Sequence, residues 1–255
     1  MKKKNQKQIA MINQDPNNNT FTQDHSPIIP QRSKLNYNLT IYERPDLTSK
    51  QKEFIELALD KKCKIILVNG PAGTSKTWLA VLCALKLLNQ KRCSDILYIR
   101  SVVESSDSKI GALPGFIEDK FNVYLQPLVD KLEELLPKNN IASLQKEQRI
   151  LGIPINFLRG LNWNAKAIVV DEAQNLNIKE MITLLTRIGK FSKVYILGDH
   201  CQSDLNGKSG FLKILNLFTD EISRENGIYT FQFSEDDVVR SELVKFIVKK
   251  IKELS

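Results

Sequence analysis

Residues 70–77 constrain the fold of this chain more than any other segment. They read Gly-Pro-Ala-Gly-Thr-Ser-Lys-Thr and lie between a β-branched run at 64–68 and a stretch with helical apolar spacing at 78–88. Glycines allow the backbone to curl around an anion, and a helix that begins near Lys76 directs its positive dipole end to the same place. The sequence therefore predicts a strand, a phosphate loop of the Walker A type and a helix, in that order.

The loop predicts a nucleotide triphosphate as ligand. Lys76 is expected to reach the β- and γ-phosphates, and the Thr77 hydroxyl to ligate Mg²⁺. Ser75 departs from the pattern, which has glycine there, and a positive φ at Ser75 would cost about 1–3 kcal/mol. The expected nucleotide contacts are Gly70, Pro71, Ala72, Gly73, Thr74, Ser75, Lys76, Thr77 and Trp78.

A second apolar run, at 167–170, ends in two adjacent acids, as a Walker B strand does. We expect Asp171 to hold Mg²⁺ and Glu172 to orient and deprotonate the water that attacks the γ-phosphate. The next run, at 194–197, leads to Gln202, whose amide could contact the γ-phosphate or that water. His200 is interpreted as a loop residue, because no second His or Cys lies at metal-ligand spacing.

Arginine is the side chain expected to neutralise charge in the transition state. Candidates outside the first 40 residues are Arg100, Arg159, Arg187 and Arg240. Arg240 is the first choice within the chain, and Arg187 or Arg159 could act on a neighbouring subunit. For each of them a structural ion pair remains the alternative.

Apolar runs alternate between strand-like and helix-like periods from about residue 47. This alternation favours an α/β fold with a mainly parallel sheet flanked by helices in three layers. Helices are expected at 48–61 and 118–136, a buried strand at 95–100, and a loop at 104–116. A last strand is expected at 227–233, followed by a closing helix at 235–254. Residues 1–40 lack an apolar period and are interpreted as a disordered basic tail before one domain at 41–255.

Charge and hydropathy limit the classes of partner and location. The net charge is +8, and the tail contributes +4 of it through six basic and two acidic residues. This balance favours an acidic partner such as nucleic acid without identifying one. Apolar runs are too short for a transmembrane helix, the start lacks the apolar core of a signal peptide, and four cysteines show no paired spacing, so a cytoplasmic location is expected.

Taken together, these motifs resemble the PhoH-like family of P-loop ATPases, which is related to the superfamily 1 helicase motors. The resemblance extends from about Thr48 to Ile251. Besides the loop at 70–77, it rests on residues 100–103, 111–115, 157–160, 171–175, 185–189, 198–205 and 237–240. Residues 101–109 depart from the family, which more often has Pro and Gly-Glu there.

The resemblance implies a RecA-like core, magnesium and ATP as ligands, and a role in RNA metabolism. In the related helicases a glutamine before the phosphate loop reads the adenine, and Gln51 matches that position. A glutamine on a helix surface is the alternative. The family is frequent in viruses of bacteria, which makes a phage gene, and hence a host cytoplasm, a further expectation.

The first functional hypothesis is an ATP hydrolase that remodels RNA or single-stranded DNA. Related helicases close the ATP site between two motor domains, whereas this chain has length for one, so a homo-oligomeric ring, such as a hexamer, is expected. The alternatives are an ATP-binding switch or binding module with little turnover, and a P-loop kinase. The kinase ranks lowest, because an arginine-rich lid is lacking and the acid pair suits activation of water.

Overall fold

Six parallel strands form the centre of the molecule. The computed structural model describes residues 33–101, 117–155, 163–205 and 207–239, together with positions 246 and 250. The strand order is β3-β2-β4-β5-β1-β6, and every pairing is parallel. The strands are β1 (Ile65–Asn69), β2 (Asp95–Arg100), β3 (Ile150–Pro154), β4 (Lys166–Asp171), β5 (Lys193–Gly198) and β6 (Ile228–Gln232).

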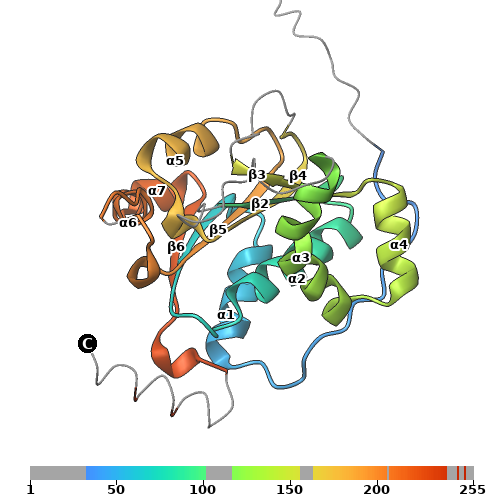
Figure 1. Cartoon of the computed structure of the whole chain (residues 1–255), viewed down its shortest axis with the longest axis horizontal. Helices are drawn as coiled ribbons and strands as arrows, with labels where there is room; N and C mark the ends of the chain where they lie inside the picture. Colours follow the sequence, from blue (N-terminus) through green and yellow to red (C-terminus); the bar gives the residue numbers. More distant parts are fainter. Residues whose placement is uncertain are drawn as a thin grey trace, which may run out of the picture. The chain divides into compact units, whose positions relative to one another are not determined.

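Helices cover both faces of this sheet, which gives the expected three layers (Figure 1). One face packs against α1 (Ser49–Leu59), α2 (Lys76–Asn89), α3 (Ile117–Leu135) and α4 (Lys138–Lys146). The other packs against α5 (Ile178–Leu185) and α6 (Phe211–Leu217), while α7 (Glu221–Glu225) contacts the edge strand β6. The α/β fold predicted from the sequence is confirmed.

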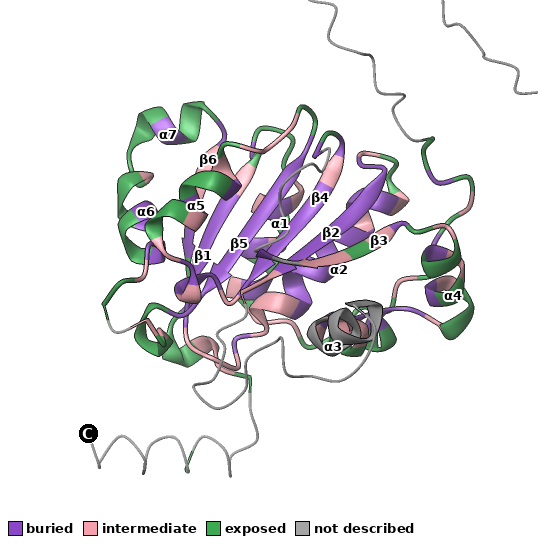
Figure 2. Ribbon diagram, turned by 45° about the horizontal axis from the view of Figure 1, so that its top comes forward, coloured by how far each residue is buried: buried purple, intermediate pink, exposed green. Residues whose placement is uncertain are grey.

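The side chains of each inner strand alternate between two separate cores. Ala167 and Val169 of β4 pack on the α2 side, whereas Ile168 and Val170 pack on the side of α5 and α6. Because successive residues of a strand point to opposite faces, both must be apolar when helices cover both faces. Figure 2 shows the result, with the central strands buried along most of their length.

Helix α2 lies in the most enclosed position of the domain. Ten of its fourteen residues are buried, so its sequence is apolar on nearly every side. Helix α1 is more amphipathic and begins with a capping box in which Thr48 and Gln51 exchange hydrogen bonds. The structure therefore confirms Thr48 as the cap of this helix, which begins at Ser49 and ends at Leu59 instead of 61.

Two expectations about the ends of the domain changed. Leu35 and Leu39 are buried in the α2-side core, so the packed part of the chain extends upstream of residue 41. At the other end, a 3₁₀ turn, η5 (Glu235–Asp237), and extended backbone to Val239 stand where the closing helix was expected to begin. Of the rest of that helix only positions 246 and 250 are described, and both are helical. The loop expected at 104–116 lies outside the described residues.

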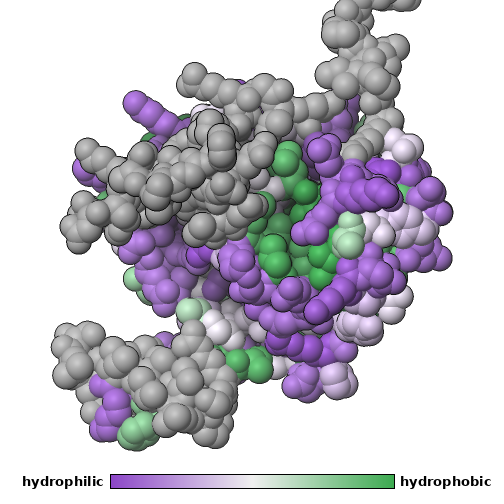
Figure 3. Space-filling view, turned by 45° about the vertical axis from the view of Figure 1, so that its right-hand side comes forward, coloured by the Kyte–Doolittle hydropathy of each residue, from purple (hydrophilic) through white to green (hydrophobic). Residues whose placement is uncertain are grey.

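Several elements were not predicted, among them β3. This edge strand carries Gly152 and ends at Pro154, two residues that weaken a strand signal. A Cβ at Gly152 would lie 1.5 Å from Cδ2 of Leu125 on α3, so a larger residue there would have to displace the Leu125 side chain. Leu151 of β3 is exposed. On one face of the molecule, hydrophobic residues gather within a hydrophilic border (Figure 3).

No helix within the described ranges is both long and apolar enough to cross a membrane. The cysteines at 63, 83 and 93 are buried free thiols, and Cys201 is an exposed one. Burial raises the pKa of Cys83 to about 12 and that of Cys63 to about 11. These two thiols therefore stay protonated and pack as small apolar side chains.

The turn between β1 and α2 contains the backbone strain that the sequence predicts. Ser75 has φ 65° and ψ 24°, the left-handed conformation that favours glycine, and Gly73 has φ 91°. A non-glycine residue in this conformation costs of order 1 kcal/mol. Ser75 caps α2 without a side-chain hydrogen bond, so no capping bond offsets this strain.

We predict that Ser75→Gly raises the free energy of unfolding by about 0.5–1 kcal/mol, because glycine adopts positive φ without strain. The measurement is equilibrium urea denaturation. Ser143→Gly inside α4 is the matched control and should lower the free energy by about 0.5–1 kcal/mol, since glycine weakens a right-handed helix. If Ser75→Gly lowered the free energy of unfolding as much as the control does, the inference of backbone strain at Ser75 would be wrong.

Candidate functional site

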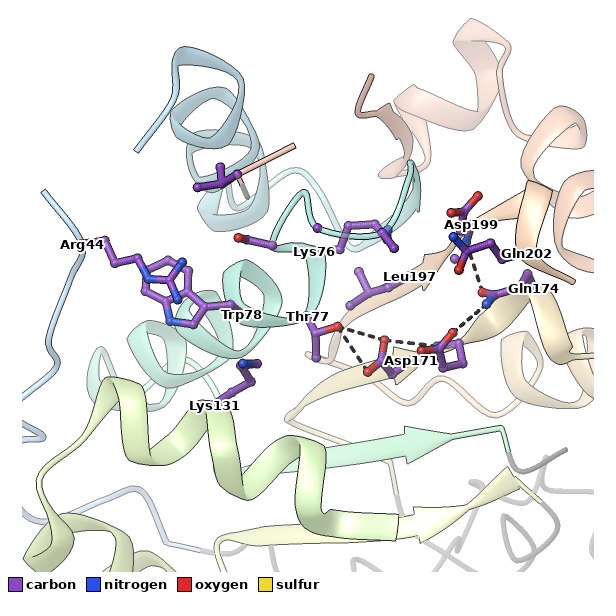
Figure 4. Close-up of a pocket in the computed structure, with 16 residues that line it drawn as sticks. Arg44, Lys76, Thr77, Trp78, Lys131, Asp171, Gln174, Leu197, Asp199 and Gln202 are labelled. Carbon is purple, nitrogen blue, oxygen red and sulfur yellow. Dashed lines mark hydrogen bonds between the residues drawn. The ribbon is translucent and has the colours of Figure 1, made fainter. Parts of the chain in front are cut away.

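A cleft opens where the carboxyl ends of the central strands meet. In a parallel sheet all strands end at the same edge, which is where α/β proteins bind ligands. The cleft holds about 410 Å³ and joins the phosphate loop to the ends of β4 and β5 (Figure 4). Its lining consists of Arg44, Ala72, Gly73, Ser75, Lys76, Thr77, Trp78, Lys131, Asp171, Glu172, Gln174, Leu197, Gly198, Asp199, Gln202 and Val239.

The ammonium group of Lys76 lies within the phosphate loop. Its Nζ donates to the carbonyl oxygens of Gly70, at 2.6 Å, and Pro71, at 2.9 Å. The Thr74 hydroxyl donates to the same Pro71 carbonyl at 3.0 Å and thereby closes the loop on itself. The loop therefore presents a cation at the start of α2, where the helix dipole adds further positive potential.

Thr77 and Asp171 join the phosphate loop to the acidic strand end. The Thr77 hydroxyl lies 3.0 Å from Oδ1 and 3.2 Å from Oδ2 of Asp171. Asp171 follows Val169 by two residues, so its side chain lies on the same face of β4 and points toward α2. The alternation that fills the core thus also brings this carboxylate to Thr77.

Tyr98 is a partner of Asp171 that sequence reasoning missed. Its hydroxyl donates to Oδ2 of Asp171 at 2.7 Å from the neighbouring strand β2. Burial, and after it the charge of Asp171, raise the pKa of Tyr98 far above its usual range. The phenol therefore keeps its proton and donates a hydrogen bond to the carboxylate. The sequence offered one signal for this partner, a hydroxyl-bearing residue near the end of a buried strand.

Glu172 is held at the mouth of the cleft by two neighbours. Its backbone is left-handed, with φ 54°, and its Oε2 accepts from Gln174 Nε2 at 2.6 Å. Arg100 forms an ion pair with Oε1 at 3.8 Å. Gln174 is buried, and its Oε1 accepts from the backbone N–H of Asp199 at 3.1 Å. Gln174 thus connects the acid after β4 to the turn after β5.

Gln202 lies on that turn, η4 (His200–Gln202), and its side chain is exposed in the cleft. Asp199, His200 and Cys201 bring three potential metal ligands within 4.8 Å of one another. The turn itself explains this cluster, since Asp199 Oδ1 accepts from the backbone of Cys201 and His200 Nδ1 contacts the amide of Asn69. His200 remains interpreted as a loop residue.

Gln51 lies behind the phosphate loop and is 2% exposed. Its Oε1 accepts from the backbone of Thr48 at 3.1 Å, and its Nε2 lies 3.4 Å from the carbonyl of Thr74. Both ends of the amide are therefore occupied inside the protein. Reading of adenine by Gln51 stays a prediction, and it requires the amide to exchange these partners.

The structure brings together nine of the predicted site residues along the cleft: Ala72, Gly73, Ser75, Lys76, Thr77, Trp78, Asp171, Glu172 and Gln202. Gly70, Pro71 and Thr74 form the back of the loop. Arg159 and Arg240 lie outside the described residues. Arg187 follows α5, is half-buried and does not line the cleft. Sequence reasoning missed Arg44 and Lys131, which reach the cleft from outside the motifs.

Comparison with known proteins gives a consistent result. The family model described as "PhoH-like protein" matches residues 45–252. The chain is 36% identical over 201 residues to a PhoH-like protein of Mycobacterium leprae, a match that covers 79% of this chain and 56% of the relative. It is 34% identical over 202 residues to a PhoH-like protein of Bacillus subtilis, covering 79% and 62%.

A third relative, Protein PhoH of Escherichia coli, is 29% identical over 188 residues, which cover 73% of this chain and 52% of that protein. The chain thus spans little more than half the length of these relatives. The match of the family model over most of the chain agrees with the parallel sheet and its phosphate loop. The chain therefore belongs to the PhoH-like family.

Proposed function

We propose that the protein binds ATP with Mg²⁺, hydrolyses the γ-phosphate, and as an oligomer couples this turnover to remodelling of RNA or single-stranded nucleic acid. The observation that carries the enzymatic part is the convergence of Lys76, Thr77, Asp171 and Glu172 in one cleft. These residues come from two segments about 95 positions apart, and the fold brings their side chains to one edge of the sheet.

The oxygen ligands present fit magnesium. A hydroxyl and a carboxylate within 3.0–3.2 Å of each other are the hard donors that Mg²⁺ takes from proteins, with water and phosphate oxygens completing its shell. When bound, Mg²⁺ supplies neutralisation of phosphate charge. Tyr98, by donating to Oδ2, fixes the Asp171 carboxylate in the orientation that faces Thr77.

The remaining residues have separate roles in the proposed reaction. Lys76 exchanges the carbonyl oxygens of Gly70 and Pro71 for phosphate oxygens, and Glu172 accepts the proton of the attacking water. Gln174 holds the Glu172 carboxylate toward the turn that carries Gln202. The Gln202 amide then donates to the γ-phosphate or to the water, so that hydrolysis changes its contacts.

An arginine from a neighbouring subunit completes the proposed site. Arg187 lies outside the lining of its own cleft, a position suited to the cleft of a second copy, and Arg159 is the other candidate in trans. Arg240 is proposed to act within the chain, because it directly follows Val239 at the cleft and the Val239 backbone donates to Gly73 at 3.0 Å. A closed ring, such as a hexamer, supplies each site with a neighbour.

The nucleic-acid part of the proposal rests on the resemblance and on the net charge of +8. The chain spans little more than half of its relatives, so the activity of those whole proteins enters only as a proposal. A motor and a switch with little turnover differ in one property: nucleic acid should accelerate hydrolysis by a motor.

We predict that Glu172→Gln abolishes hydrolysis while ATP still binds. The glutamine cannot accept a proton, so the rate should fall at least about 100-fold, while its amide oxygen can still accept from Gln174. The measurements are phosphate release and the dissociation constant for ATP by calorimetry. Glu133→Gln, on the exposed surface of α3, is the matched control and should change neither. Unchanged hydrolysis in Glu172→Gln would exclude Glu172 as the base.

We predict that RNA or single-stranded DNA stimulates ATP hydrolysis by the full chain several-fold at low salt, and that stimulation falls as salt rises because phosphate contacts are screened. Phosphate release measured over a salt series tests this. Sedimentation of the protein with ATP and Mg²⁺ should show an oligomer. A monomer that binds no nucleic acid at low salt would eliminate the remodelling part and leave the hydrolase.

A further inference from the structure

The end of the cleft away from Glu172 and Gln202 carries two cationic side chains, Arg44 and Lys131, that the proposed phosphate chemistry does not use. Arg44 from the segment before α1, Trp78 from α2 and Lys131 from α3 line this end. Figure 4 shows Arg44 lying across Trp78, on the side of the loop opposite Gln202. Three segments distant in the sequence therefore meet at one position beside the phosphate loop.

The Arg44 guanidinium contacts an aromatic ring on one side and a carboxylate at its edge. Its Cζ lies 4.6 Å from the centroid of the Trp78 ring, and its Nη2 donates to Oε2 of Glu134 at 2.5 Å. The backbone two residues earlier is tied to α3, because the N–H of Tyr42 donates to the carbonyl of Leu135 at 2.8 Å. An arginine held in this way keeps a fixed plane and loses little entropy when a ligand stacks on it.

One face of that plane is available to a ligand. Trp78 is 3% exposed and covers the inner face, whereas the Arg44 side chain retains 41% exposure and lines the cleft. Planar cations stack on aromatic rings through the ring quadrupole and dispersion. The order Trp78, Arg44, ligand would form a three-layer stack, with the indole as the buried support.

The phosphate loop determines which part of a nucleotide reaches this plane. Glu172 and Gln202 mark the end of the cleft where the γ-phosphate is cleaved in the proposed function, and Trp78 directly follows the Mg²⁺ ligand Thr77. A triphosphate on the loop therefore directs its sugar and base away from Gln202, toward Arg44. The base is the planar group that fits the outer face of the guanidinium.

We propose that the Arg44 guanidinium, supported by Trp78 and Glu134, stacks on the nucleobase and that this stack provides base affinity with little selectivity among bases. Every base has a π face, so a stack does not distinguish adenine from guanine. An edge reader would distinguish them, and the amide of Gln51 is occupied by Thr48 and Thr74. This inference rests on the proposed nucleotide site.

The test compares ATP, GTP and inorganic tripolyphosphate, each with Mg²⁺, by calorimetry on the full chain. Tripolyphosphate has the phosphates without the base, so it separates the loop from the stack. We expect Arg44→Ala to weaken ATP and GTP by about tenfold each and to change tripolyphosphate less than about twofold. Arg44→Lys should behave like Arg44→Ala, because lysine keeps the charge and loses the plane.

Lys50 offers a matched control. Its Nζ lies 4.7 Å from the centroid of the Phe231 ring, the same kind of contact, yet it does not line the cleft. Lys50→Ala should leave all three affinities unchanged. Thermal unfolding of the Arg44 variants within a few degrees of the wild type shows that the fold is retained.

Other outcomes would overturn the inference. Wild-type affinity in Arg44→Lys, or equal weakening of tripolyphosphate and ATP, would show that charge and not stacking matters. A preference for ATP over GTP of about 100-fold in the wild type would indicate edge reading instead. If the wild type binds tripolyphosphate and binds ATP no more tightly, the stacking inference is wrong and the proposed phosphate site stands. If the wild type binds neither ligand, both the stacking inference and the proposed nucleotide site are wrong.

Discussion

The parallel pairing of β4 with β2 and β5 determines where the acidic residues of this chain can act. Alternation along β4 buries Val169 under α2, and the same alternation directs Asp171 two residues later toward Thr77. Parallel neighbours end at the same edge, so Tyr98 reaches Asp171 from one side and the Asp199 turn reaches Gln174 from the other. The site is therefore a consequence of sheet register, and a shift of β4 by one residue would move Asp171 to the opposite face.

Local sequence patterns predicted much of this arrangement and missed the parts that depend on distant packing. Strands β1, β2, β4, β5 and β6 were predicted because apolar runs and turn residues mark buried parallel strands. Strand β3 was not, since Gly152 and Pro154 weaken its signal, and the close approach of Leu125 to Gly152 is visible only in the folded chain. The burial of Leu35 and Leu39 likewise depends on a core that a tail-like composition does not reveal.

In the candidate site, too, the residues in local motifs were predicted and those that depend on distant packing were missed. The phosphate loop, the acid pair and Gln202 belong to motifs with fixed spacing, and the structure places their side chains along one cleft. Tyr98 and Arg44 belong to no motif, and their contacts with Asp171 and Trp78 follow from strand pairing and from the path of the segment before α1. For Gln51 the family resemblance gave the position, but the capping box that engages its amide oxygen became visible only in three dimensions.

The proposed hydrolysis depends on magnesium and nucleotide meeting between Thr77 and Asp171. The most direct measurement is the calorimetric dissociation constant for ATP with Mg²⁺ and with a chelator, in the wild type and in Asp171→Asn. If Thr77 and Asp171 hold the metal, Mg²⁺ tightens ATP binding by about tenfold or more in the wild type, and this gain is lost in Asp171→Asn. ATP affinity that is the same with Mg²⁺ and with chelator in the wild type would contradict it.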